Sequence, residues 1–166
     1  MEETPVQGES PGALVARLAR AKASAIAGQQ PQAWVIGSDQ VAVLDSTGTQ
    51  TVLGKPGTDA RCQEQLRACS GRTVEFLTAV ALMRQDGEEL IEFTDVTRVT
   101  FRALDEPTIA RYVAKELPLD CAGGFKSEGL GITLCEAIDS ADPSALIGLP
   151  LIRLSAALRS AGFELP

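Results

Sequence analysis

The sequence predicts an α/β fold, a mixed twisted sheet flanked by helices, built as a single domain over residues 1–166. Hydrophobic residues make up 45% and charged residues 22% of the chain, which is ordinary for a globular protein of a length that can bury a core. Segments of helical and strand periodicity alternate without strict βαβ regularity, which favours this fold class. The polar, acidic start of the chain does not resemble a secretory signal, so a cytoplasmic protein is expected.

The first helix is the most strongly marked element. Ser10 and Pro11 are favourable at a helix start, and Gly28 is favourable just beyond a helix end. Further helices are expected over 58–68, 104–116 and 150–161, and strands over 33–36, 41–44, 51–53, 72–83, 89–102 and 132–138, with a hairpin turn at Gln85-Asp86-Gly87.

Composition excludes several classes of function. The chain has no histidine and its four cysteines lack a metal-binding spacing, which argues against zinc sites, Cys–His pairs and Ser–His–Asp triads. The net charge of −7 argues against binding a nucleic-acid polymer, and no apolar run is long enough for a membrane span. Catalysis is therefore expected to depend on carboxylates, lysines, arginines, hydroxyls or a metal with oxygen ligands.

Residues 37–40 (GSDQ) form a polar interruption between two short apolar segments, 33–36 and 41–44. A carboxylate placed just after a buried strand can be held rigidly, as a general base or a metal ligand requires, and Asp39 is the candidate. The alternative is an Asp that hydrogen-bonds its own backbone in a turn, and this segment alone favours that alternative.

Two glycine-bearing loops could contact a ligand. Residues 54–56 (GKP) present Lys55 beside a flexible and a stiff residue, although a solvated lysine is the simpler interpretation. Residues 123–131 place four glycines around Lys126 and Glu128, and their backbone amides can surround a ligand. Glu128 could accept two hydrogen bonds from a guanine base; the alternative is a tight crossover between strands with both charges solvated.

Four segments occur in a recognisable order: residues 36–41 (IGSDQV), 54–56 (GKP), 121–132 (CAGGFKSEGLGI) and 147–151 (IGLPL). Together they resemble the Maf family, and specifically its branch of 7-methyl-GTP pyrophosphatases, for which FKSEG is the distinctive part. The resemblance extends from about residue 2 to residue 159.

The resemblance implies hydrolysis of nucleoside triphosphates between the α and β phosphates, with a divalent metal, Mg²⁺ or Mn²⁺. Asp39 matches the proton acceptor, and Gln40 and Glu128 match substrate-specificity positions. Lys55 matches a phosphate-contacting lysine and Glu3 an acidic residue at the metal, although Glu3 by itself is simply part of a polar chain start. The resemblance also implies an inosine triphosphate pyrophosphatase-like fold and a homodimer. A carboxylate base and a hard cation suit this histidine-free chain.

The chain departs from the family pattern at its start. Family members begin with a strand and a Ser-x-Ser-Pro-x-Arg loop, so this fold is expected to lack the N-terminal strand and phosphate loop. That predicts weakened catalysis and an exposed sheet edge. Three alternatives stay open: a nucleotide-binding or regulatory protein linked to cell division, a dTTP/UTP pyrophosphatase of the sister branch, and a purely structural domain.

Overall fold

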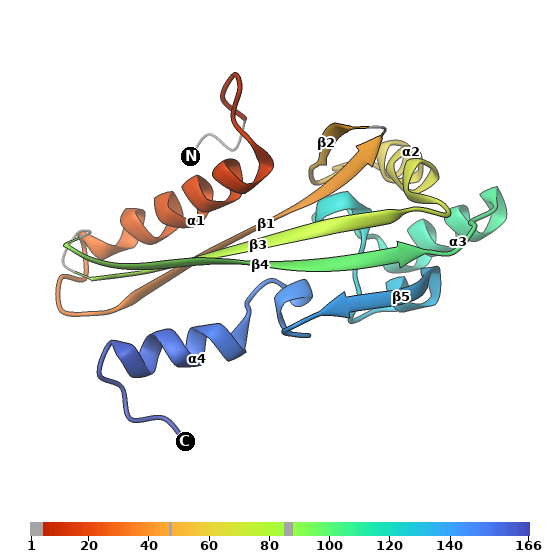
Figure 1. Cartoon of the computed structure of the whole chain (residues 1–166). Coiled ribbons are helices and arrows are strands. Elements are labelled where there is room, and N and C mark those ends of the chain that lie inside the picture. The colour runs from red at the N-terminus through yellow and green to blue at the C-terminus, as the bar shows by residue number, and fades with distance from the viewer. Residues whose placement is uncertain (1–4, 47, 85–87) are drawn as a thin grey trace. The chain divides into compact units, whose positions relative to one another are not determined.

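A computed structural model describes residues 5–46, 48–84 and 88–166 of the chain. Its five-stranded sheet has the order β2-β1-β3-β4-β5, and the two outer pairs, β1–β2 and β4–β5, are antiparallel (Figure 1). The expected α/β fold is confirmed. The strands are β1 (Val35–Ser46), β2 (Thr49–Leu53), β3 (Thr73–Arg84), β4 (Glu89–Phe101) and β5 (Cys135–Ser140), and the α-helices are α1 (Pro11–Ala27), α2 (Asp59–Cys69), α3 (Glu106–Glu116) and α4 (Leu151–Ser160).

The chain divides into two compact units. The first contains Met1–Gln40, Leu77–Val96 and Ala141–Pro166, and the second contains Val41–Phe76 and Thr97–Ser140. β1, β3 and β4 contribute residues to both units. Whether residues 1–166 act as one domain stays a prediction. Within the described ranges, no helix combines the length and apolar character needed to cross a bilayer.

In the first unit, α1 begins and ends where the sequence predicts. The Ser10 side chain accepts a hydrogen bond from the Ala13 amide, and Gly28 is the C-cap. α1 packs against β1 at Gly37, where an added Cβ would overlap the Ala19 carbonyl and lie 2.6 Å from the Ala23 nitrogen. Only glycine permits so close an approach of helix and strand.

α4 covers an apolar cluster in the same unit. The cluster combines inward-facing residues of β3 and β4 with one face of α4, and Figure 1 shows this helix alongside the strands. Its buried members are Val80, Leu82, Phe93, Leu154 and Ala157.

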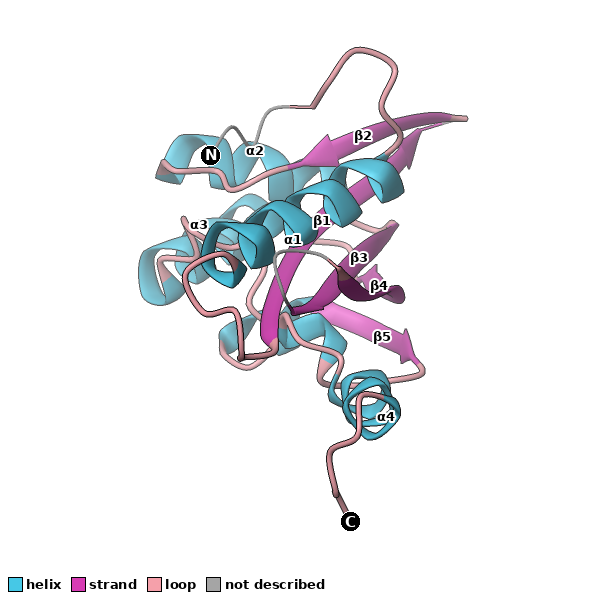
Figure 2. Cartoon of the chain, turned by 90° about the vertical axis from the view of Figure 1, so that its left-hand side faces the viewer, coloured by secondary structure: helices cyan, strands magenta, loops and turns pink. Residues whose placement is uncertain are grey.

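The second unit is organised around α2 and α3, which lie side by side in both views (Figures 1 and 2). Their N-caps are Thr58 and Asp105, whose side chains accept hydrogen bonds from backbone amides in the first turn. The Phe125 ring packs against Phe76 and Phe101, with ring centroids 5.6 and 5.2 Å apart.

The structure corrects two expected elements. Residues 37–40 do not separate two strands but lie within the continuous strand β1, because their polar side chains find partners in neighbouring segments. The segment 130–134, expected to include the start of a strand, is a 3-10 turn, and β5 begins only at Cys135. The hairpin turn expected at 85–87 lies outside the described residues.

Candidate active site

Asp39 forms an ion pair with Lys22 of α1. The Asp39 side chain is 11% exposed and the Lys22 side chain 34% exposed, so the pair is largely withdrawn from solvent. The pairing follows from the close contact at Gly37, because Lys22 lies on α1 between Ala19 and Ala23, the residues that meet this glycine. The ion pair uses Oδ1 of Asp39.

The neighbours of Asp39 in β1 tie a distant segment to the strand. The Ser38 hydroxyl lies 2.7 Å from the Gly148 carbonyl oxygen and 3.0 Å from that of Ala79. The Gln40 amide nitrogen lies 3.1 Å from the carbonyl oxygens of both Ala145 and Leu146, and 2.9 Å from the Thr78 hydroxyl. Ser38 and Gln40 of the GSDQ motif therefore have a structural role, because they hold the 145–148 segment against β1. The Asp39 carboxylate instead contacts the Lys22 ammonium.

A shallow cavity of about 330 Å³ lies against the segment that Ser38 and Gln40 hold. Its walls include Ser144, Ile147 and Gly148, and Ile147 is mostly exposed. The IGLPL motif thus forms a largely apolar hollow next to β1, suitable for a flat or apolar part of a ligand.

In the second unit, backbone hydrogen bonds join the two glycine-bearing loops. The Gly54 carbonyl accepts hydrogen bonds from the Gly123 amide, at 3.2 Å, and from the Gln65 side chain, at 3.2 Å. Pro56 is buried, whereas Lys55 is exposed. The loop that carries Lys55 is therefore attached to the loop that carries Lys126 and Glu128.

Buried contacts fix the position of the 123–131 loop. The Tyr112 hydroxyl donates to the Gly124 carbonyl at 3.2 Å and accepts from the Lys126 amide at 3.1 Å. Burial raises the pKa of Tyr112 above its usual value, which keeps this hydroxyl protonated as a donor. The Glu116 carboxylate accepts a 2.6 Å hydrogen bond from the Leu130 amide, and this bond, with the charge of Lys126, lowers the pKa of Glu116.

The two charged candidates of this loop differ in their surroundings. The Lys126 ammonium lies 3.3 Å from Glu116, whose hydrogen bond and charge raise the pKa of Lys126. Glu128 is exposed and accepts only a long 3.4 Å hydrogen bond from the Ser127 hydroxyl. Glu128 is thus open to a ligand, whereas Lys126 is engaged within the protein.

The predicted site residues therefore fall into two groups. Asp39 and Gln40 are adjacent in the first unit, and the loops bearing Lys55, Lys126 and Glu128 are joined in the second. Glu3, the expected metal ligand, lies outside the described residues. The described part of the chain contains no group of three or more acidic, histidine or cysteine side chains that could hold a metal.

Lys22 is one of three residues near the candidate site that the sequence alone did not indicate. Two small residues, Ala19 and Ala23, flank it on a helix, and a lone glycine, Gly37, stands two positions before Asp39. These are the marks of a close helix–strand contact, but they identify Lys22 only once helix and strand are known to be neighbours. Tyr112 and Glu116 were missed for the same reason.

Comparison with known proteins identifies the family of the chain. The profile of the family described as Maf-like protein matches residues 1–161, and the chain belongs to the Maf family. A protein of Xanthomonas oryzae pv. oryzae, named 7-methyl-GTP pyrophosphatase, is 55% identical over the whole chain and 84% of its own length. A protein of the same name from Alkalilimnicola ehrlichii is 56% identical over 91% of this chain and 74% of its own length. Another, from Pseudomonas aeruginosa, is 48% identical over the whole chain and 84% of its own length.

Proposed function

We propose that this protein is a metal-dependent pyrophosphatase that hydrolyses 7-methyl-GTP to 7-methyl-GMP and pyrophosphate in the cytoplasm. The observation that carries the proposal is the largely buried Asp39 carboxylate, held on β1 by Lys22 in a motif typical of the family. The shared name of relatives at 48–56% identity supports the substrate. The homodimer that the resemblance implies stays a prediction.

Asp39 acts in this proposal as the general base. Its Oδ2 accepts a proton from a water molecule, whose oxygen forms a bond to the α-phosphorus. The bond between that phosphorus and the oxygen bridging to the β-phosphorus breaks, and pyrophosphate leaves with the bond's electron pair. Lys22 holds the carboxylate on one side, so that the base has a fixed direction, and fixed geometry is the main source of catalysis in phosphoryl transfer.

The phosphates need positive charge, and two sources are available. Lys55 is an exposed lysine on a loop stiffened by the buried Pro56, and we assign it to the phosphate chain. A divalent cation, Mg²⁺ or Mn²⁺, would neutralise phosphate charge and make water more acidic. Asp39 would supply one carboxylate to such a cation, because Mg²⁺ is usually held by one or two carboxylates together with substrate phosphates.

Recognition of the base is assigned to Glu128 and Gln40. The exposed Glu128 carboxylate can accept hydrogen bonds from N1–H and the exocyclic amine of guanine. Methylation at N7 makes the ring cationic and these donors stronger, so a carboxylate favours 7-methylguanine over guanine. Gln40 contributes indirectly, because its amide holds the Ala145–Leu146 backbone beside the apolar hollow.

The test is pyrophosphate release from 7-methyl-GTP, GTP, dTTP and UTP with Mg²⁺ or Mn²⁺. We expect the highest rate on 7-methyl-GTP, and a loss of at least about a hundredfold for Asp39→Asn, the range found when a general base is removed. Asp45→Asn, an exposed carboxylate at the other end of β1, is the matched control and retains activity.

Two outcomes would replace the proposal. A preference for dTTP and UTP would identify the protein as a dTTP/UTP pyrophosphatase, the activity of the sister branch. Binding of 7-methyl-GTP without release of pyrophosphate from any substrate would favour a nucleotide-binding or regulatory protein.

A further inference from the structure

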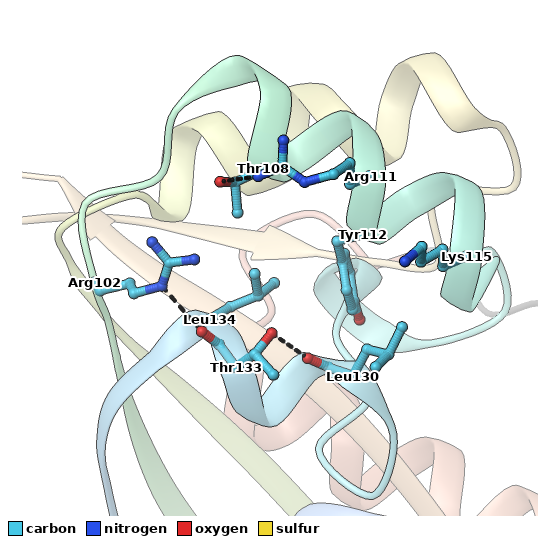
Figure 3. Close-up of a pocket in the computed structure, with 8 residues that line it drawn as sticks. All are labelled: Arg102, Thr108, Arg111, Tyr112, Lys115, Leu130, Thr133 and Leu134. Carbon is cyan, nitrogen blue, oxygen red and sulfur yellow. Dashed lines mark hydrogen bonds between the residues drawn. The ribbon is translucent and has the colours of Figure 1, made fainter.

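A second cavity, in the second unit, is lined by positively charged side chains (Figure 3). It has a volume of about 220 Å³ and lies between α3 and the 130–134 turn. Arg102, Arg111 and Lys115 supply its charge, and Tyr112, Leu130 and Leu134 supply apolar walls. Leu130 belongs to the 121–132 (CAGGFKSEGLGI) segment, but none of these six residues has a role in the proposed reaction.

The three cations of this cavity are not neutralised by carboxylates. The Arg102 guanidinium donates to the Thr133 carbonyl at 2.9 Å, and Arg111 donates to the Thr108 hydroxyl at 3.1 Å. Neither they nor Lys115 forms an ion pair with a residue of the described ranges, whereas Arg67 and Arg98 of the same unit pair with Glu106 and Glu75.

The acids around the cavity offset its positive charge only in part. Asp105 is directed to the Thr108 amide, which chiefly lowers its pKa, and the charges of Arg111 and Arg102 lower it further. Glu116 is directed to the Leu130 amide and Lys126. In a chain of net charge −7, three cations around one hollow, none of them in an ion pair within the described ranges, form a local site for an anion.

The size and chemistry of the hollow define the ligand. A cavity of about 220 Å³ is smaller than the roughly 300 Å³ at which sites for drug-sized ligands begin, which favours a ligand smaller than a whole nucleotide. Two guanidinium groups and an ammonium suit the several oxygens of a phosphate group. We propose that this cavity, defined by Arg102, Arg111 and Lys115, is a second binding site, separate from Asp39, for a small multivalent phosphate anion.

An anion bound at this site would alter the surroundings of the 123–131 loop. Tyr112 forms a wall of the cavity and its hydroxyl contacts Gly124 and Lys126, while Leu130, another wall, is held through its amide by Glu116. An anion against these walls therefore changes the environment of the Lys126 and Leu130 amides as well as those of α3.

The test is a titration of the isotope-labelled full chain with inorganic pyrophosphate, followed by the amide resonances. We expect saturable shifts at residues 108–115 and 130–134 that weaken with added salt. Arg111→Ala with Lys115→Ala should raise the dissociation constant for these shifts by about tenfold or more, because two of the three cations are removed. Arg159→Ala, an exposed arginine on α4, is the control and should leave the constant unchanged.

The proposal is overturned if these amides do not shift, or if they shift equally in the double variant. Both altered side chains are exposed, so the spectrum of the double variant should otherwise match that of the parent and verify folding. Pyrophosphate is also a product of the proposed reaction. If it bound at the candidate active site, the amide resonances of residues 36–41 would shift instead. Failure of the second site and failure of the proposed reaction are thus seen at different resonances.

Discussion

At the scale of single residues, the contact between Asp39 and Lys22 connects folding with chemistry. Both side chains are largely withdrawn from water, and a charged partner stabilises the carboxylate in such a place. In the proposed reaction, the same partner holds Oδ1 and leaves Oδ2 as the oxygen that accepts the proton. Lys22 is therefore expected to affect both stability and turnover.

Lys22→Met should lower turnover of 7-methyl-GTP by about tenfold or more, because the base loses its fixed direction. It should also lower the free energy of unfolding by about 1–3 kcal/mol, less than for a fully buried pair because Lys22 is 34% exposed. Initial rates and urea unfolding check the two effects. Lys22→Arg keeps the charge and should lose much less, and an unchanged Lys22→Met variant would remove this residue from the site.

Glu128→Gln tests the assignment of base recognition. Because the neutral amide accepts more weakly from a cationic ring, the ratio of kcat/KM for 7-methyl-GTP over GTP should fall by about tenfold, with a smaller change in kcat on GTP. Glu136→Gln, another exposed glutamate of the second unit, is the control. An unaltered substrate profile would contradict the assignment.

At the scale of elements, Gly37 determines how closely α1 approaches β1. A side chain there would meet the α1 backbone at Ala19 and Ala23, so Gly37→Ala must push helix and strand apart. We expect a loss of about 1–3 kcal/mol in unfolding free energy, and lower activity because Lys22 moves away from Asp39. Gly12→Ala is the matched control, since a Cβ there meets nothing within 4 Å, and it should not destabilise. Equal stability of the two variants would refute the close contact.

Asp142 plays a comparable part for α4. It is 3% exposed and accepts hydrogen bonds from the Ile152 amide at 2.6 Å and the Ser144 amide at 2.9 Å. Burial alone would raise its pKa, but these hydrogen bonds, with that of the Ser144 hydroxyl, outweigh burial and lower the pKa. Its stabilising effect is thus complete above the unfolded pKa of about 4 and disappears as the pH falls through the lower folded value.

Asp142→Asn should therefore destabilise the protein at pH 7 by about 1–3 kcal/mol and by less at low pH. Urea unfolding of parent and variant at several pH values measures this difference. The exposed Asp139 gives a control, Asp139→Asn, with no such pH-dependent loss. A constant difference between parent and Asp142→Asn across the pH range would contradict the account.

The sequence predicts elements best where the signals are local. The caps Ser10, Thr58 and Asp105 act within three residues, and their helices begin as expected. It fails at residues 37–40, because the groups that satisfy Ser38 and Gln40 are up to about a hundred residues away, at Ala145 and Gly148.

The glycine-rich loop shows the same limit. Added side chains at Gly124 and Gly129 would each lie 2.5 Å from a side-chain atom, of Cys62 and Glu116 respectively. Close packing therefore explains these glycines without a ligand, a reason that only the folded neighbours reveal. Glu128, which carries the base assignment, is by contrast exposed on the loop that they shape.

At the scale of the whole molecule, family membership follows from motifs in a fixed order and from a match over nearly the entire chain. Composition predicts that catalysis depends on carboxylates and lysines, since the chain has no histidine. It could not foresee that three cations gather around one hollow of an acidic protein, because Arg102 is separated in sequence from Arg111 and Lys115 and joins them only through the fold.

The central claim is that Asp39 directs water to the α-phosphorus of 7-methyl-GTP. The most direct measurement is a product analysis of this reaction in water labelled with heavy oxygen, for the parent and for Asp39→Asn. The account predicts 7-methyl-GMP carrying the label, unlabelled pyrophosphate, and neither product above background for the variant. Labelled pyrophosphate, formation of 7-methyl-GDP, or an equally active variant would contradict it.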